Sequence, residues 1–214
     1  MEETVLDNLG IGSESGVGIN VCNMWLNGYN SQGGWSGITP YDEIQPAIGF
    51  PQKNPYHCFD VWTHTAYAVA AAPADEPLRL VMLLHDLGKP AHHSVGEDGR
   101  AHFYGHPETG AQMAREILLR LKSDNATLER TVVLVREHDI VWPTTPAGMP
   151  RLIGRIGEEN VRLLFDVQRA DLAAHSDFAR EKNAEGIRAA FLLFEDVLDS
   201  TPAFTVKDLP VNGA

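Results

Sequence analysis

One pair of neighbouring residues in this chain could hold a metal ion: His85 and Asp86, which Lys89 follows closely. In mid-helix, adjacent side chains point about 100° apart and could hardly share an ion. Gly88 and Pro90 should end the helix here, and the backbone can then turn both side chains toward one point. Lys89 would offer a point charge to a phosphate oxygen, although a lysine after a helix end could equally complement the helix dipole.

Imidazole and carboxylate ligands suit several divalent cations, so the pair does not distinguish manganese, iron, nickel, cobalt, zinc and magnesium. Three further ionisable residues, His64, His138 and Asp171, fall on the apolar faces of predicted helices. Asp171, for example, lies four residues after Val167. A buried carboxylate is costly unless it is paired, hydrogen-bonded or bound to a metal. Because several such residues occur together, we expect them to share a partner.

The elements that would position these residues are helices, because apolar residues recur at helical spacing from Asp60 onward. We expect a short turn at 152–156 and helices over residues 60–72, 76–87, 106–121, 124–138, 158–175 and 184–198. Residues 91–105 should form a polar loop and residues 142–150 a proline-rich connection. No segment alternates strongly enough to predict a strand, so the fold class is all-α, a helical bundle.

We divide the chain into an irregular N-terminal arm (1–50), a helical domain (51–200) and a C-terminal tail (201–214). Glycine, serine and asparagine crowd the arm, in which Trp25, Trp35 and Phe50 are candidate anchors. The glycines at 10–16 follow no convincing strand and open no apolar helix, so we interpret them as a flexible loop and not as a phosphate-binding loop.

The composition is that of an ordinary globular protein, since 43% of the 214 residues are hydrophobic and 21% are charged. The net charge is 17 − 29 = −12, which argues against a fold-wide basic surface for nucleic acid. Cys22 and Cys58 make no disulfide framework. The chain has neither an apolar run of about 18 residues nor a basic signal-peptide start. We therefore expect a cytoplasmic protein that does not enter a membrane.

The order of His64, the His85-Asp86 dyad and Asp171, in a helical setting, resembles the HD-domain superfamily of metal-dependent phosphohydrolases. The segment 50–65, Tyr104-Gly-His-Pro-Glu-Thr-Gly-Ala and Leu134-Val-Arg-Glu-His resemble the HD region of bacterial tRNA nucleotidyltransferases, the CCA-adding enzymes. The resemblance covers about residues 50–175, and residues 203–213 more loosely. A dyad with matching flanking blocks is a specific signal, whereas a lone His-Asp would be a weak one.

The resemblance implies a ligand set of one of two sizes. The smaller set, which would hold one ion, consists of His64, His85, Asp86 and Asp171. His106 and His138 extend it to the set of two-metal members, in which Asp86 would bridge and the two added histidines would hold the second ion. The sequence leaves the choice between one ion and two open.

Several of these residues have an ordinary structural alternative. Asp171 could form a salt bridge with Arg169 or with a neighbouring arginine. His106, which precedes a proline, could be a helix cap, and His138 could be a half-buried ring stacked near Trp142.

The remaining histidines are weaker candidates. His57 could support a ligand or protonate the leaving group, and His175 is expected to be structural. The polar loop, which could contact substrate, carries His92, His93 and His102.

The function that the resemblance implies is a phosphomonoesterase or phosphodiesterase in which a metal-activated water attacks phosphorus. Asp86 and Lys89 would be its catalytic residues. The substrate would be a nucleotide, a cyclic nucleotide or the terminal phosphate at an RNA 3′ end. tRNA is a candidate partner, and self-association into a homo-oligomer is compatible with the sequence.

Nucleotide addition is not expected of this chain. That reaction needs a head domain with a Gly-Ser or Gly-Gly motif followed by paired aspartates, but no Asp-x-Asp follows the glycines at 10–18. We therefore interpret the chain as an HD region standing alone or as a shortened relative. Two alternatives are a non-catalytic tRNA- or RNA-binding scaffold and one subunit of a split tRNA nucleotidyltransferase.

Overall fold

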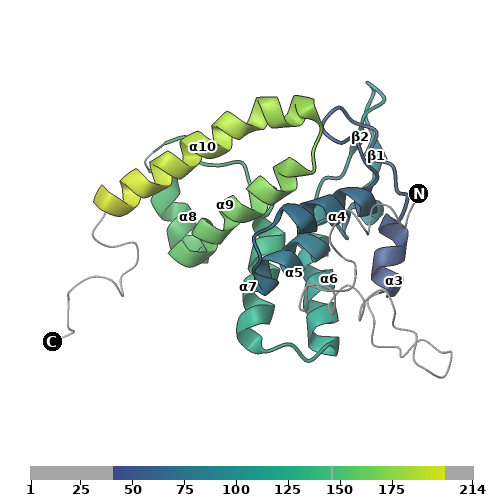
Figure 1. Cartoon of the computed structure of the whole chain (residues 1–214), viewed down its shortest axis with the longest axis horizontal. Helices are drawn as coiled ribbons and strands as arrows, with labels where there is room; N and C mark the ends of the chain where they lie inside the picture. Colours follow the sequence, from purple (N-terminus) through teal and green to yellow (C-terminus); the bar gives the residue numbers. More distant parts are fainter. Residues whose placement is uncertain (1–40, 146, 201–214) are drawn as a thin grey trace.

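The structure, a computed structural model, describes residues 41–145 and 147–200 and has helices in nearly all of its regular elements (Figure 1). The longer helices are α4 (Val61–Ala71), α5 (Glu76–Leu84), α6 (His106–Arg120), α7 (Asn125–Glu137), α8 (Gly148–Ile156), α9 (Glu158–Ala173) and α10 (Asp177–Ser200). The short elements are α3 (Tyr41–Ile44), η1 (Gln45–Ala47), η2 (Lys89–His92), β1 (Ser94–Val95) and β2 (Ala101–His102). The all-α prediction is confirmed.

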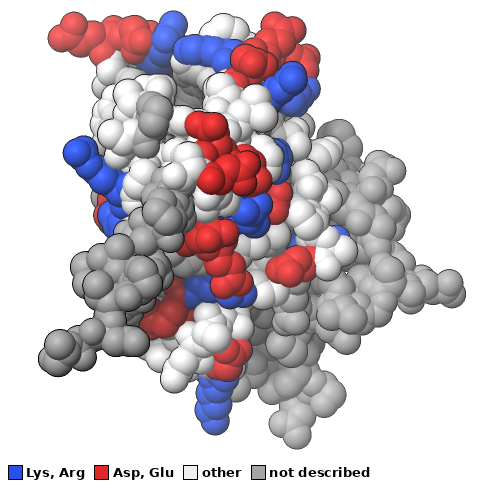
Figure 2. All heavy atoms as spheres, turned by 90° about the vertical axis from the view of Figure 1, so that its left-hand side faces the viewer, with Lys and Arg blue, Asp and Glu red and all other residues white. Residues whose placement is uncertain are grey.

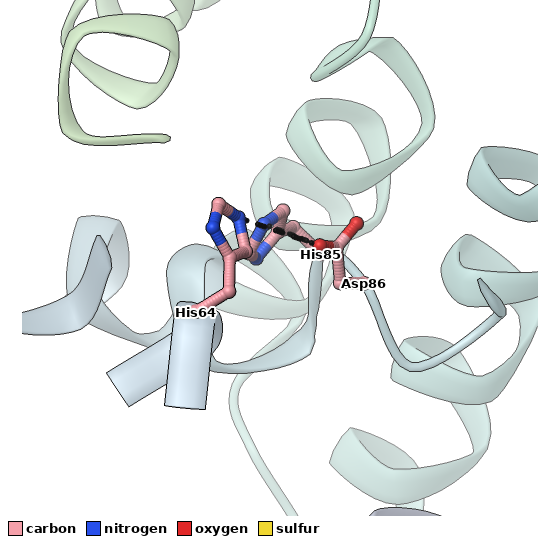
Figure 3. A group of neighbouring side chains, drawn as sticks. All are labelled: His64, His85 and Asp86. Atoms are coloured by element: carbon pink, nitrogen blue, oxygen red, sulfur yellow. Dashed lines mark ion pairs between the residues drawn. The ribbon is translucent and has the colours of Figure 1, made fainter. Parts of the chain in front are cut away.

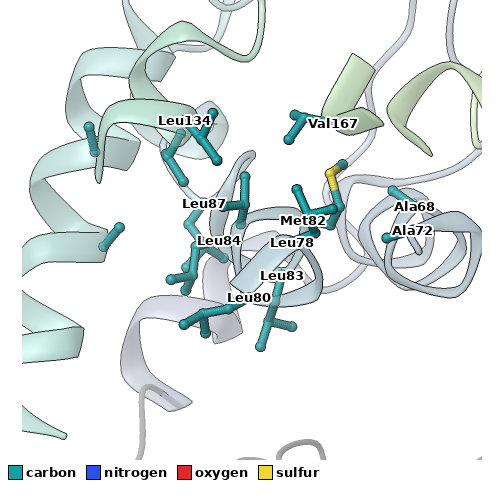
Figure 4. Close-up of a cluster of buried hydrophobic side chains, with 14 of the residues drawn as sticks. Ala68, Ala72, Leu78, Leu80, Met82, Leu83, Leu84, Leu87, Leu134 and Val167 are labelled. Atoms are coloured by element: carbon teal, nitrogen blue, oxygen red, sulfur yellow. The ribbon is translucent and has the colours of Figure 1, made fainter. Parts of the chain in front are cut away.

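Helix α5 lies at the centre of the larger hydrophobic core, packed against α4, α7 and α9 (Figure 4). Its residues Val81, Met82 and Leu84 are fully buried. A helix that is apolar on nearly every side must be covered on every side, which explains its central place. The dyad follows directly after this helix, so the most deeply buried element of the fold delivers it.

A second, smaller core lies between α8, α9 and α10. Phe165 of α9 is buried there, stacked on Trp142 at a ring-centroid distance of 3.9 Å and packed against Phe194 of α10. Helix α9 therefore contributes to both cores, and this packing holds its polar residues in place between them.

The predicted starts of two helices are confirmed by side-chain caps. The carboxylate of Asp60 accepts hydrogen bonds from the backbone N–H groups of Trp62 and Thr63, and Asp124 accepts one from Thr127. These bonds satisfy donors that the first turn of a helix leaves without partners.

Other boundaries differ from the sequence prediction. Helix α10 begins at Asp177 and not at 184, and the Ser176 hydroxyl caps it by accepting a hydrogen bond from the backbone N–H of Ala179. The sequence did not indicate this first part of the helix, because most side chains over residues 177–183 are exposed and form no apolar pattern. Helix α8 begins at Gly148, with Pro150 in its first turn, where we expected only a turn from 152. Helix α5 ends at Leu84 and not at 87, so the dyad lies in the turn that follows.

The polar loop (91–105) and the last residues of the arm (1–50) contain regular structure that the sequence did not predict. Residues 94–95 and 101–102 pair as a small antiparallel hairpin, too short to leave an alternating pattern. Residues 41–47, expected in an irregular arm, are helical, and Ile44 and Ala47 are buried in the larger core. Phe50 packs edge-on against Phe103.

The glycines at 10–16, Trp25, Trp35 and the tail 201–214 lie outside the described residues. Among the residues that are described, no helix has the length and apolar character needed to cross a membrane.

The turn that carries the dyad packs closely against the start of α6, and Gly88 in the turn makes this close contact. A Cβ added at Gly88 would lie 2.3 Å from the carbonyl oxygen of His106 and 2.9 Å from the amide nitrogen of Gly110. Both atoms belong to backbone, so a larger residue could not be accommodated by rotating a side chain.

We therefore predict that Gly88→Ala lowers the free energy of unfolding by about 1–3 kcal/mol or more, the usual cost of overpacking. Gly186→Ala is the matched control, because a Cβ at Gly186 meets nothing within 4 Å. Alanine in that helix should stabilise by up to about 1 kcal/mol. Chemical denaturation of both variants measures the difference, and equal stabilities would contradict the tight contact.

Candidate metal centre

The carboxylate of Asp86 lies between two groups of histidines and is 1% exposed. Its Oδ2 atom is 3.2 Å from Nε2 of His85 and 3.5 Å from Nε2 of His64. Figure 3 shows these two rings beside the carboxylate. Its Oδ1 atom is 3.4 Å from Nε2 of His106 and 3.6 Å from Nε2 of His138. One buried carboxylate thus offers a different oxygen to each group.

Asp171 of α9 completes the group on the Oδ2 side. Its Oδ1 atom lies 2.8 Å from Nε2 of His64 and 3.5 Å from Nε2 of His85. The structure therefore brings together all four residues of the smaller predicted set, from α4, the turn after α5, and α9.

On the Oδ1 side, the Nε2 atoms of His106 and His138 lie only 3.2 Å apart. His106 is the first residue of α6, and His138 follows the last residue of α7. Two groups of three residues, each with ligand atoms within 4.8 Å of one another, could therefore each hold a metal ion: His64, His85 and Asp86, and Asp86, His106 and His138.

The backbone fixes which nitrogen each ring presents to the carboxylates. All four histidines place Nδ1 within hydrogen-bond distance of a backbone carbonyl, which can only accept, so Nδ1 carries the proton. The accepting carbonyls are those of Ala174 for His64, Met82 for His85, Phe103 for His106 and Val135 for His138. Histidines that bind metals are commonly oriented by such bonds. Each ring thus turns its Nε2, the other possible ligand atom, toward the carboxylates.

The donor set fits a divalent cation. Nε2 of His85 and Oδ1 of Asp86 are buried without a hydrogen-bond partner among the described residues, and Oδ2 of Asp86 forms an ion pair with the Lys89 ammonium. The lone pairs of His106 and His138 would face each other across 3.2 Å. A cation bound between these groups would satisfy the buried polar atoms and separate the facing lone pairs. Without a cation, both features cost free energy.

The electrostatics favour positive charge at the same place. Burial alone would lower the pKa of His85, but the nearby carboxylates of Asp86 and Asp171 raise the pKa to about 10. Burial alone would raise the pKa of Asp86, but His85 and Lys89 hold it well below its usual value. His175 and His64 do the same for Asp171, against its burial. Without a metal, protons supply part of the positive charge that the carboxylates demand.

Comparison with known proteins agrees with this geometry. A family model described as the HD domain matches residues 56–175, which is more than half of the chain and spans both histidine groups. The chain belongs to the HD-domain family. HD domains generally bind divalent metals and are generally hydrolases.

This HD domain is also similar to tRNA nucleotidyltransferases. It is 33% identical over 157 residues to the A-adding tRNA nucleotidyltransferase of Deinococcus radiodurans, an alignment that covers 71% of this chain and 35% of that protein. It is 36% identical over 104 residues to the CC-adding tRNA nucleotidyltransferase of Thermus thermophilus (45% and 23%). It is 37% identical over 106 residues to the multifunctional CCA protein of an Azoarcus species (46% and 24%). The alignments thus span about a third or less of these relatives.

The structure does not show the contacts that the structural alternatives for the predicted ligands require. Arg169 pairs with Asp166 and not with Asp171. Trp142 stacks on Phe165 and not on His138. The side chain of His106 makes no capping hydrogen bond at the start of α6.

Lys89 differs from its predicted role as a free point charge. Its buried ammonium lies 2.7 Å from Oδ2 of Asp86, donates to Oε1 of Gln52 at 2.8 Å and lies 3.2 Å from Nε2 of His57. An ammonium has three hydrogens, and these three neighbours can accept all of them. In this arrangement Lys89 directs its charge at Asp86, and a phosphate would have to displace one of its partners.

His57 is held as a neutral acceptor for Lys89. Its Nδ1 lies 2.9 Å from Oδ1 of Asn54, which only accepts, so Nε2 is free to accept from the ammonium. Burial, Lys89 and His175 lower the pKa of His57 to about 2. In this arrangement His57 supports Lys89, which matches the supporting role considered for it, and its Nε2 accepts a hydrogen bond and has no proton to give to a leaving group.

Three polar residues that the sequence did not single out support the centre: Gln52, Asn54 and Gln168. The Gln168 amide of α9 donates to the backbone carbonyls of His138 and Ile140 at 2.9 Å each, and its carbonyl accepts from the Trp142 indole. Gln168 thereby ties the end of α7 to α9. Gln52 and Asn54 lie in an irregular segment, where no periodic pattern could have pointed to them.

The centre lies in a cavity of about 1230 Å³. Its walls come from the hairpin and the start of α6, from residues 136–144 and from α9 and α10. Asp86, Lys89 and Asp171 line it, so the carboxylates that face the histidines are accessible from this cleft.

We predict that metal binding releases protons. The raised pKa of His85 means that, between pH 6.5 and about 10, the folded metal-free protein holds a proton on this ring that the unfolded chain releases. A metal requires the neutral ring.

Calorimetric titration of manganese at pH 8 in two buffers of different ionisation enthalpy should show the release of roughly one proton per chain. His102→Ala, outside both histidine groups, should not change it. Heats that are the same in both buffers would contradict this account.

Gln168→Ala should weaken binding at the His106–His138 group by about 10- to 100-fold, because the carbonyl of His138 loses its fixed partner. Gln112→Ala is the control, since that exposed glutamine donates its hydrogen bond to Glu116 on its own helix. Metal titration of both variants decides the question, and equal affinities would show that Gln168 does not position the group.

Proposed function

We propose that this HD domain is a divalent-metal-dependent phosphohydrolase that acts on a phosphate ester of a nucleotide, a cyclic nucleotide or an RNA end. The observation that carries the proposal is the placement of Asp86, whose two buried oxygens each face a separate group of imidazole nitrogens. A purely structural carboxylate would need one charged partner, and it would not need four imidazole rings turned toward it.

The ligands in this proposal are the six predicted residues, His64, His85, Asp86, His106, His138 and Asp171. Asp86 bridges the two groups, and Asp171 adds a second carboxylate to the first. When bound, divalent ions lower the pKa of water and neutralise charge that develops on a phosphoryl group. Lys89, held by Gln52 and His57, orients Asp86 and adds a fixed positive charge beside it.

The substrate class is supported by two of the relatives, whose names describe enzymes that act on tRNA. Their shared segment with this chain is the HD domain, so we propose a nucleotide or RNA-terminal phosphate and not nucleotide addition. The free, exposed thiol of Cys58 is compatible with action in the reducing cytoplasm.

A non-catalytic RNA-binding scaffold is the second candidate, favoured by the same similarity to tRNA enzymes. The charge argues against it. Figure 2 shows lysines, arginines and carboxylates mixed over the coloured part of one face, without a continuous basic patch there. The net charge of the chain is −12. A scaffold would retard tRNA in a gel at low salt and hydrolyse no ester.

We predict that Asp86→Asn lowers metal-stimulated phosphoesterase activity by at least about 100-fold, the scale expected when a group that stabilises transition-state charge is lost. Asp166→Asn, which alters an exposed carboxylate paired with Arg169, should retain activity. A panel of mono- and diesters with manganese or nickel measures both, with thermal unfolding to confirm that each variant folds. Full activity in Asp86→Asn would refute the proposal.

A further inference from the structure

The cleft above the metal centre carries uncovered apolar surface. Among the described residues, the two most exposed large hydrophobic side chains are Val141 (89%) and Tyr104 (77%). Both line this cleft. Exposed apolar surface beside a binding site commonly marks contact with a ligand. Here it adjoins the proposed metal centre, and cations held there would attract an anionic group, so the cleft suits a ligand that has an anionic end and an apolar body.

The Tyr104 ring stacks against the His102 ring. It stacks on His102 with a centroid distance of 5.2 Å and an interplanar angle of 9°. The stacked pair lies at the surface, because Tyr104 is 77% exposed. A ring stacked on one face and widely exposed is a ready platform for a second flat group.

The position of Tyr104 in the chain ties this platform to the metal centre. Tyr104 precedes His106 by two residues, so their Cα atoms can be at most about 7 Å apart. Gly105 between them has φ of +85°, a conformation that favours glycine, and turns the chain from the platform into helix α6. The platform thus begins two residues before a proposed metal ligand, and Tyr104 and His106 line the same cleft.

We propose that Tyr104, backed by His102, stacks against the base of the substrate, which makes the ligand of this cleft a nucleotide or a base at an RNA end and not a base-free phosphoester. The inference rests on the proposed function and deepens it. The size of the cavity, about 1230 Å³, leaves room for a base beyond the phosphate.

The test compares binding of adenosine 5′-monophosphate and ribose 5-phosphate, which carry the same phosphate with and without a base. Calorimetry with the manganese-loaded protein should show that wild type prefers the nucleotide. Tyr104→Ala should weaken nucleotide binding by about 5- to 100-fold, the loss typical of removing one base stack. It should leave ribose 5-phosphate unchanged, and Tyr104→Phe should bind as wild type does.

Tyr67→Ala is the matched control, because Tyr67 also stacks on a neighbouring ring, Phe59, but does not line the cleft. Equal affinities of wild type for the two ligands, or equal weakening of both in Tyr104→Ala, would overturn the base platform. A preference for the nucleotide that Tyr104→Ala abolishes, in a protein that hydrolyses no ester, would support the platform and refute the phosphohydrolase.

Discussion

The burial of one carboxylate between four imidazole nitrogens is the constraint on which the rest of the structure depends. Asp86 cannot remain charged and 1% exposed without positive charge close to both of its oxygens. Lys89 supplies one such charge, and His85, with its raised pKa, supplies another in the metal-free protein. The remaining demand is on the side of His106 and His138, whose facing lone pairs a cation would satisfy. The arrangement is explained by metal binding and is costly without it.

The fold serves this constraint by bringing distant segments to one turn. Helix α5 is buried on nearly every side and ends just before the dyad. Gly88 and Gly110 let the turn approach the start of α6 closely enough for His106 to reach Asp86. Helix α9 belongs to both hydrophobic cores, and it supplies Asp171 to one group and Gln168 to the support of the other. Loss of packing at these places would therefore loosen ligands that lie far apart in the sequence.

The sequence predicted much of this because the ligands fall on periodic helices or at their ends. The dyad, His64 and Asp171 stood out as ionisable residues in apolar surroundings, and the structure brings them together. What it could not predict lies where no period exists. Gln52 and Asn54 act through an irregular segment, and the saturation of Lys89 depends on contacts 32 and 37 residues away. The first turns of α10 were missed because exposed residues there leave no apolar pattern.

The central claim is that Asp86 belongs to two groups of residues that each hold a metal ion. The metal content per chain tests this claim most directly. The protein purified without chelator and incubated with manganese, then freed of excess ion, should contain two ions per chain by elemental analysis. His138→Ala should reduce the content to one, because His64, His85, Asp86 and Asp171 remain. One ion in wild type and an unchanged value in His138→Ala would limit the centre to the smaller set. No ion in wild type would contradict the account.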